Sequence, residues 1–193
     1  MTPASSKPVR PRHAASLILL RKTVAGPQVL MGRRPAKSRF APDVFVFPGG
    51  RVDAADYDRP TASPLAADCV RRTGADTRLA AALATAAIRE TEEETGLVLA
   101  HDHGPLILAA RAITPTNSPV RFHARFFAAD ADLASGEAAD TSELADLAWR
   151  GLEDALRLPL FDITEAVLKT LQREGAPFMM TYRAGATIVR ALP

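Results

Sequence analysis

Residues 89–97 read RETEEETGL, and four of the five positions from 90 to 94 are glutamates. Like charges at neighbouring positions of one helix face repel by roughly 0.2–0.5 kcal/mol per pair. A chain retains such a cluster where water solvates the carboxylates or where a cation binds among them. The position of each glutamate around a helix distinguishes these two interpretations.

The residues before this run predict a helix over 77–95. The segment is rich in Ala and Leu, Asp76 or Thr77 can cap its start, and Gly96 stands where a glycine commonly ends a helix. Apolar residues on two sides of this helix indicate that it packs between two layers of the protein.

Helical spacing places the acids on the buried side. At about 100° per residue, Glu90 and Glu94 continue an apolar stripe, Glu93 lies at its edge and Glu92 points elsewhere. The stripe consists of Leu79, Leu83, Ala86 and Ala87. Buried carboxylates are costly unless they are paired or bind metal, and hard oxygen ligands suit Mg²⁺ or Mn²⁺. The alternative is a solvated, charged helix end with a glycine cap.

Length and composition fit a single globular domain. The chain has 193 residues, 47% of them hydrophobic, and a formal net charge of +2, which does not indicate a nucleic-acid partner. Its one cysteine, Cys69, excludes an internal disulfide and fits a reducing cytoplasm. No apolar run approaches the roughly 20 residues of a membrane span.

The order of apolar runs predicts a mixed α/β sandwich. We expect a flexible N-terminal tail over residues 1–13 and a single domain over 14–193. Strands are expected at 16–20, 29–32, 44–47, 106–113, 120–128, 147–149 and 187–192. Besides the helix at 77–95, helices are expected near 66–72 and over 152–156 and 163–173.

A glycine turn ends the predicted strand at 44–47. Its sequence is Phe47-Pro48-Gly49-Gly50, and paired glycines let the backbone approach a ligand closely. Together with the acidic run, this turn resembles the signature of the Nudix hydrolases. That signature reads Gly, five residues, Glu, seven residues, Arg-Glu, an apolar residue, any residue, Glu-Glu, any residue, Gly and an apolar residue. Its second half is matched by Arg89, Glu90, Glu93, Glu94, Gly96 and Leu97.

The first half departs from the family pattern. Gly50 matches, Asp56 stands in place of the Glu, and 32 residues rather than seven separate Asp56 from Arg89. We therefore expect an insertion at about 57–76, and we expect it to lie over the active site as a lid. The resemblance implies a Nudix-like α/β/α sandwich with a mixed β-sheet.

The resemblance also implies roles for individual residues. Glu90, Glu93 and Glu94 would hold Mg²⁺ or Mn²⁺ with the carbonyl of Gly50, and Arg89 would orient the acids. Substrate-binding residues would be Arg34, Arg39, Gly49 and Gly50. A general base could come from Glu137, Asp140 or Glu143, for which a solvated loop is the alternative.

An interrupted signature of this kind is similar to the acyl-CoA diphosphatase branch of the family. The stretches that carry this likeness are VFVFPGGRVDAAD (44–56) and AAIRET (86–91), with Arg34 and Arg39 at the expected distances before Phe47. CoA or acyl-CoA is thus the expected substrate, with ADP-ribose, dinucleotides and nucleotide sugars as alternatives. A non-catalytic nucleotide-binding regulatory module and a structural protein remain as other classes. Neither nucleic acid nor membrane is an expected partner, and a homodimer is left open.

Overall fold

The computed structural model describes residues 9–38, 42–59, 63–100 and 104–193. Within them, strands are β1 (Arg12–Thr23), β2 (Gly26–Arg33), β3 (Phe45–Val46), β4 (Gly49–Arg51), β5 (Val98–Leu99), β6 (Ile107–Ile113), β7 (Phe122–Asp130), β8 (Ala134–Ser135), β9 (Ala145–Gly151), β10 (Phe178–Arg183) and β11 (Ala186–Ala191). Helices are η1 (Ala54–Tyr57), α1 (Ala67–Thr73), α2 (Thr77–Thr95), η2 (Ala131–Leu133), α3 (Leu152–Ala155) and α4 (Asp162–Gln172).

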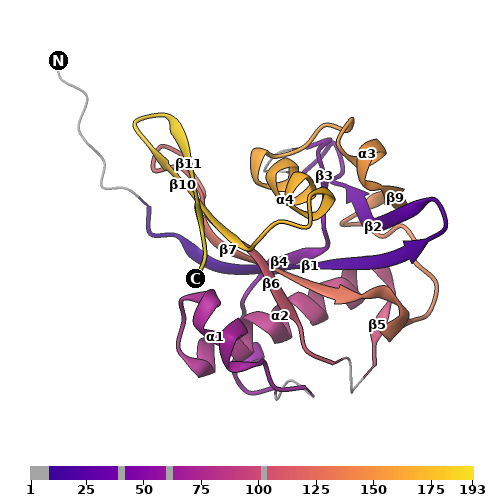
Figure 1. Cartoon of the computed structure of the whole chain (residues 1–193), viewed down its shortest axis with the longest axis horizontal. Coiled ribbons are helices and arrows are strands. Elements are labelled where there is room, and N and C mark those ends of the chain that lie inside the picture. Colours follow the sequence, from indigo (N-terminus) through magenta and orange to yellow (C-terminus); the bar gives the residue numbers. More distant parts are fainter. Residues whose placement is uncertain (1–8, 39–41, 60–62, 101–103) are drawn as a thin grey trace.

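A mixed sheet forms the middle layer. Its described strands run in the order β11-β10-β6-β7-β1-β2-β3, with β4 added to β1 and β9 added to β2. The pairs β1–β7 and β6–β10 are parallel, and the other neighbours in this sheet are antiparallel. Figure 1 shows α1 and α2 on one face and α3 and α4 on the other. The predicted α/β/α sandwich with a mixed sheet is confirmed.

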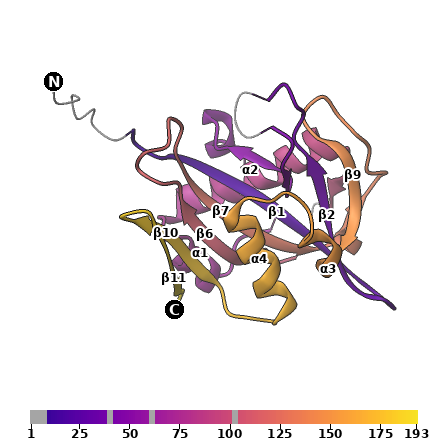
Figure 2. The ribbon, with the colours of Figure 1, turned by 90° about the horizontal axis from the view of Figure 1, so that it is seen from above.

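Each face of the sheet has its own core. On one side α2 packs Leu83, Ala84 and Ala87 against strand residues such as Leu17 and Phe127. On the other side α4 packs Val167 and Leu168 against Phe126, Phe178 and their neighbours. Figure 2 shows α4 crossing above the strands.

Helix α2 begins and ends where the sequence predicts. The side chain of Asp76 accepts a hydrogen bond from the backbone N–H of Leu79 at 2.8 Å. Gly96 ends the helix with φ of +76°, a left-handed conformation that glycine adopts at little cost. These two signals are local, which is why the sequence was sufficient to find them.

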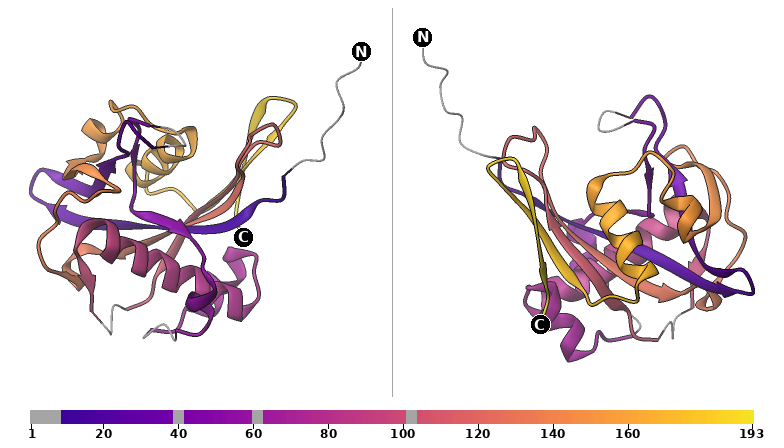
Figure 3. Two further views of the ribbon diagram at one scale, coloured as in Figure 1. Left: turned by 180° about the vertical axis from the view of Figure 1, so that it is seen from behind. Right: turned by 45° about the horizontal axis from the view of Figure 1, so that its top comes forward.

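Two expectations at the chain ends differ from the structure. Strand β1 begins at Arg12, inside the tail expected over 1–13, because residues 12–20 pair in parallel with β7. Strand β10 was not expected at all, although it lies between β6 and β11. The hairpin of β10 and β11 forms an edge of the sheet, as Figure 3 shows.

Arginines from the sheet tie the end of α1 to the core. Arg125, only 1% exposed, donates from Nε to the carbonyl of Thr73 at 3.2 Å. Arg111 donates from Nη1 to the carbonyl of Arg72 at 3.4 Å. Carbonyls at a helix end carry partial negative charge, so the end of α1 compensates the two cations. Burial lowers the pKa of the neighbouring His123 to about 3, which keeps that ring neutral beside Arg111.

Candidate active site

The glycine turn lies directly against helix α2. The backbone N–H of Gly49 donates to Glu94 Oε2 at 2.8 Å. A Cβ at Gly49 would lie 2.4 Å from the carbonyl oxygen of Ala15, and φ of this residue is +154°. Only glycine therefore fits this position. Because Gly49 has no side chain, β4 can pair closely with β1.

Gly50 makes a second close approach. A Cβ at Gly50 would lie 2.3 Å from the carboxyl carbon of Glu90, so the Glu90 carboxylate occupies the space beside the Gly50 backbone. Both contacts place the glycine turn beside the acidic helix.

Burial perturbs the two acids that contact the turn. Glu94 is 5% exposed, and burial raises its pKa to about 8, opposed by the hydrogen bond from Gly49. Burial also raises the pKa of Glu90, opposed by Arg89. A carboxylate whose charged form is disfavoured in this way gains stability from a nearby cation.

Arg89 holds this arrangement together. It donates to both oxygens of Asp56, at 3.0 and 3.2 Å, and to Glu93 Oε2 at 2.9 Å. Its Nη1 also lies 3.0 Å from Glu90 Oε1. The hydrogen bond with Asp56 is the main cause that raises the pKa of Arg89. The long segment between Asp56 and Arg89 therefore does not keep Asp56 from the site.

The remaining glutamates lie on the outer side of the helix. Glu92 is exposed, and the side chain of Glu93 is 55% exposed where it pairs with Arg89. The phase expected from the sequence, with Glu90 and Glu94 inward and Glu93 at the edge, is what the structure shows.

Glu90 and Glu94 open onto a cleft of about 580 Å³. At this acidic end the cleft is also lined by Gly49, Gly50, Arg34, Arg51 and Glu143. Arg51 was not expected from the sequence, although it directly follows the glycine pair. Arg39, an expected substrate-binding residue, lies outside the described residues.

The three candidate bases are separated by the structure. Glu143 lines the cleft, and its charge acts on both Glu90 and Glu94. Asp140 instead accepts backbone hydrogen bonds from Leu147 at 2.8 Å and Asp146 at 3.0 Å, which fixes its loop. Glu137 is exposed and does not line the cleft.

Aromatic side chains also line the cleft. Phe122, Phe126, Phe161 and Tyr182 line it together with Ala14, Ala112, Ala124 and the first turn of α4. These residues come from strands and a helix that are distant along the chain.

The described part of the insertion does not form a lid. Among residues 57–59 and 63–76, none lines the cleft, and α1 instead contacts β6 and α2. The arginines that bind the end of α1 lie on the sheet face opposite α4. Their contacts therefore hold α1 on that face, away from the cleft. Residues 60–62 lie outside the described part of the chain.

The residues present suit a divalent cation in their chemistry. Two desolvated carboxylates, Glu90 and Glu94, meet at a glycine backbone, and hard cations prefer oxygen ligands. Within the described residues, however, no group of three or more His, Cys, Asp or Glu side chains is assembled to hold an ion. Glu93 is directed to Arg89 rather than into the cleft.

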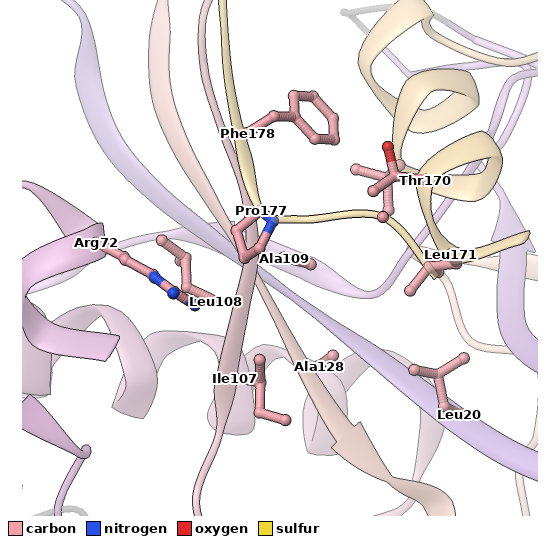
Figure 4. A pocket seen from close by; sticks show the side chains of 12 residues that line it. Leu20, Arg72, Ile107, Leu108, Ala109, Ala128, Thr170, Leu171, Pro177 and Phe178 are labelled. Carbon is pink, nitrogen blue, oxygen red and sulfur yellow. The ribbon is translucent and has the colours of Figure 1, made fainter. Parts of the chain in front are cut away.

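A second, smaller hollow of about 270 Å³ lies at the other end of α4. Figure 4 shows its largely apolar lining, which includes Leu20, Ile107 and Phe178, with Arg72 at its margin. Its lining residues include no carboxylate, so the larger cleft is the candidate active site.

Comparison with known proteins identifies related structures. A family model described as the NUDIX domain matches residues 10–171. A NUDIX hydrolase from Alicyclobacillus acidocaldarius is 27% identical with a TM-score of 0.68, covering 84% of this chain and 91% of that one. A MutT NUDIX hydrolase from Burkholderia pseudomallei is 23% identical with a TM-score of 0.57, covering 83% of this chain and 98% of that one.

One further comparison and one property of the helices complete this description. A search of curated proteins finds no match. Among the described residues, no helix has the length and apolar character that crossing a membrane requires.

Proposed function

Because this chain belongs to the Nudix hydrolase family, whose domain spans residues 10–171, we propose that it uses Mg²⁺ or Mn²⁺ to cleave the diphosphate of CoA or acyl-CoA. The family acts on nucleoside diphosphate derivatives, and the chain is a pyrophosphohydrolase. The metal, the roles of individual residues and the substrate are what the proposal adds.

One observation carries the proposed metal centre. Glu94 and Glu90 contact the backbone of Gly49 and Gly50 at the acidic end of a large cleft. Burial disfavours the charged form of both acids, so a cation beside them would recover part of the lost free energy. Glu90, Glu94 and the carbonyl of Gly50 would hold it, and Glu93 would join them by turning from Arg89 toward the cation.

A divalent cation bound there would neutralise phosphate oxygens and make a water molecule a better nucleophile. Arg89 keeps the acids in place through its contacts with Asp56, Glu93 and Glu90. Arg34 and Arg51, which line the same end, would bind the negative charge that develops on the phosphate.

Glu143 is the proposed general base. Of the three acids in the loop before β9, it is the one that lines the cleft. It would accept the proton of the attacking water, which adds to one phosphorus while the bond from that phosphorus to the bridging oxygen breaks. With CoA the products are 3′,5′-adenosine diphosphate and phosphopantetheine.

The choice of CoA is supported by sequence motifs. The signature is interrupted after VFVFPGGRVDAAD, as in the acyl-CoA diphosphatase branch that the chain resembles, and Arg34 lines the cleft. ADP-ribose, dinucleotides and nucleotide sugars are the alternative substrates. A non-catalytic binding module is less well supported, because the chain retains Glu90, Glu93 and Glu94.

A substrate panel tests the proposal. CoA, an acyl-CoA, ADP-ribose, NADH and a nucleotide sugar are each incubated with Mg²⁺ or Mn²⁺ at a concentration on the order of millimolar, with and without a chelator. We expect chelator-sensitive cleavage that is fastest for CoA or acyl-CoA. Faster turnover of another compound would reassign the substrate, and silence on the whole panel would favour a binding module.

A further inference from the structure

Three alanines form a row along the floor of the cleft. Ala14 on β1 pairs with Ala124 on β7, and Ala124 pairs with Ala112 on β6. All three line the cleft. Three methyl groups in one row across adjacent strands leave a surface on which a planar group can lie.

Aromatic side chains line the same cleft as these alanines. Phe122 and Phe126 come from β7, Phe161 from the start of α4, and Tyr182 from β10. Aromatic rings stack on planar groups, and stacking of a base on an aromatic side chain is favourable for every base.

The side chain of Tyr182 is held by a hydrogen bond to Asp162, the first residue of α4. Its hydroxyl donates to Asp162 Oδ2, while Asp162 Oδ1 accepts the N–H of Ile163 at 2.8 Å. Burial and the bond with Asp162 raise the pKa of Tyr182, so its hydroxyl remains a donor at neutral pH. This hydrogen bond links the terminal hairpin to the first turn of α4.

We propose that Tyr182, positioned by Asp162, is a specificity-determining residue that forms one wall of a subsite for a nucleobase. The inference rests on the proposed function in one respect, since the diphosphate is taken to lie at the acidic end. The ring would then select substrates in which a planar base is attached to the diphosphate. Asp162 acts through Tyr182 and is a positioning residue.

Binding rather than turnover tests this inference. The affinities of ADP and of pyrophosphate, both with Mg²⁺, are measured by calorimetry on the full chain. Pyrophosphate lacks the base, so it reports the acidic end alone. We expect Tyr182→Leu to weaken ADP binding by about tenfold and to leave pyrophosphate binding unchanged.

Two further variants separate the ring from the hydrogen bond. Tyr182→Phe keeps the ring and should weaken ADP binding less than Tyr182→Leu does. Asp162→Asn keeps an acceptor and should retain ADP affinity, whereas Asp162→Ala should lose part of it. Thr187→Val, at the exposed residue paired with Tyr182 across the hairpin, serves as the control and should change neither affinity.

A purely structural role gives a different pattern. If Tyr182 only anchors the hairpin, its substitutions would weaken ADP and pyrophosphate equally, in step with the loss of thermal stability, and the proposal would be overturned. Wild-type protein that binds ADP no better than pyrophosphate would also overturn it. Failure of the substrate panel, by contrast, would remove the proposed hydrolysis without changing these affinities.

Discussion

Arg89 donates two hydrogen bonds to the carboxylate of Asp56, although 33 positions separate the two residues along the chain. The Asp56 side chain is fully buried, and that of Arg89 is 14% exposed. The residues between them include α1 and the first part of α2, and the chain brings Asp56 and Arg89 back into contact. Asp56 thus supports helix α2 despite being one methylene shorter than Glu.

Replacing Asp56 should destabilise the protein. Asp56→Ala leaves the largely buried Arg89 without its main partner, and loss of one member of a buried ion pair costs about 3 kcal/mol or more. Urea unfolding of Asp56→Ala measures this, with Asp58→Ala, at an exposed position nearby, as the control. Equal stability of the two variants would show that the pair does not hold the site together.

The two turn glycines should respond differently to the same substitution. Gly49→Ala would place Cβ 2.5 Å from the Ser16 Cα at a left-handed φ, so we expect poor folding. The three atoms nearest to the Cβ of Gly50→Ala all belong to the Glu90 carboxylate, which can move. We therefore expect normal stability with at least about tenfold lower hydrolysis. A fully active Gly50→Ala enzyme would contradict a role for the Glu90 position.

Stability without metal should fall as pH rises. Burial raises the pKa of folded Glu94 from 4.5 to about 8, so its folded form prefers the proton. The contribution of protonated Glu94 to the free energy of unfolding is fully present below about pH 4.5. It is lost between pH 4.5 and 8. Unfolding in a chelator at pH 5 and pH 8 should show this loss for the wild type and a smaller loss for Glu94→Gln. Adding Mg²⁺ should stabilise the wild type more at pH 8 than at pH 5. Equal stabilisation at the two pH values would refute the burial of Glu94 as the cause of the pH dependence.

Substitutions at the three candidate bases should have different effects on the kinetics. Glu143→Gln should lower kcat by about 10²-fold or more and flatten the ascending limb of the pH–rate profile. Glu137→Gln should leave kcat unchanged, because Glu137 is exposed and outside the cleft. Asp140→Asn should affect stability rather than the profile, since Asp140 accepts two backbone hydrogen bonds. An unchanged profile in Glu143→Gln would exclude it as the base.

The acidic half of the site was predictable because its signals are local. Helical spacing alone places Glu90 and Glu94 inward and Glu92 outward, and the cap residues set the helix ends. The aromatic half was not predictable, since Ala14, Ala112, Ala124 and Tyr182 become neighbours only through pairing of β1, β7, β6 and β10. The insertion was expected over the site, but Arg111 and Arg125 fix its end elsewhere.

The most direct test of the metal centre compares two neighbours on one helix. Glu92→Gln and Glu93→Gln make the same chemical change, and both side chains are exposed, but only Glu93 pairs with Arg89. Mg²⁺-dependent release of 3′,5′-adenosine diphosphate from CoA should fall by about 10- to 100-fold in Glu93→Gln and stay at the wild-type rate in Glu92→Gln. Equal rates in the two variants would contradict the metal centre proposed on this helix.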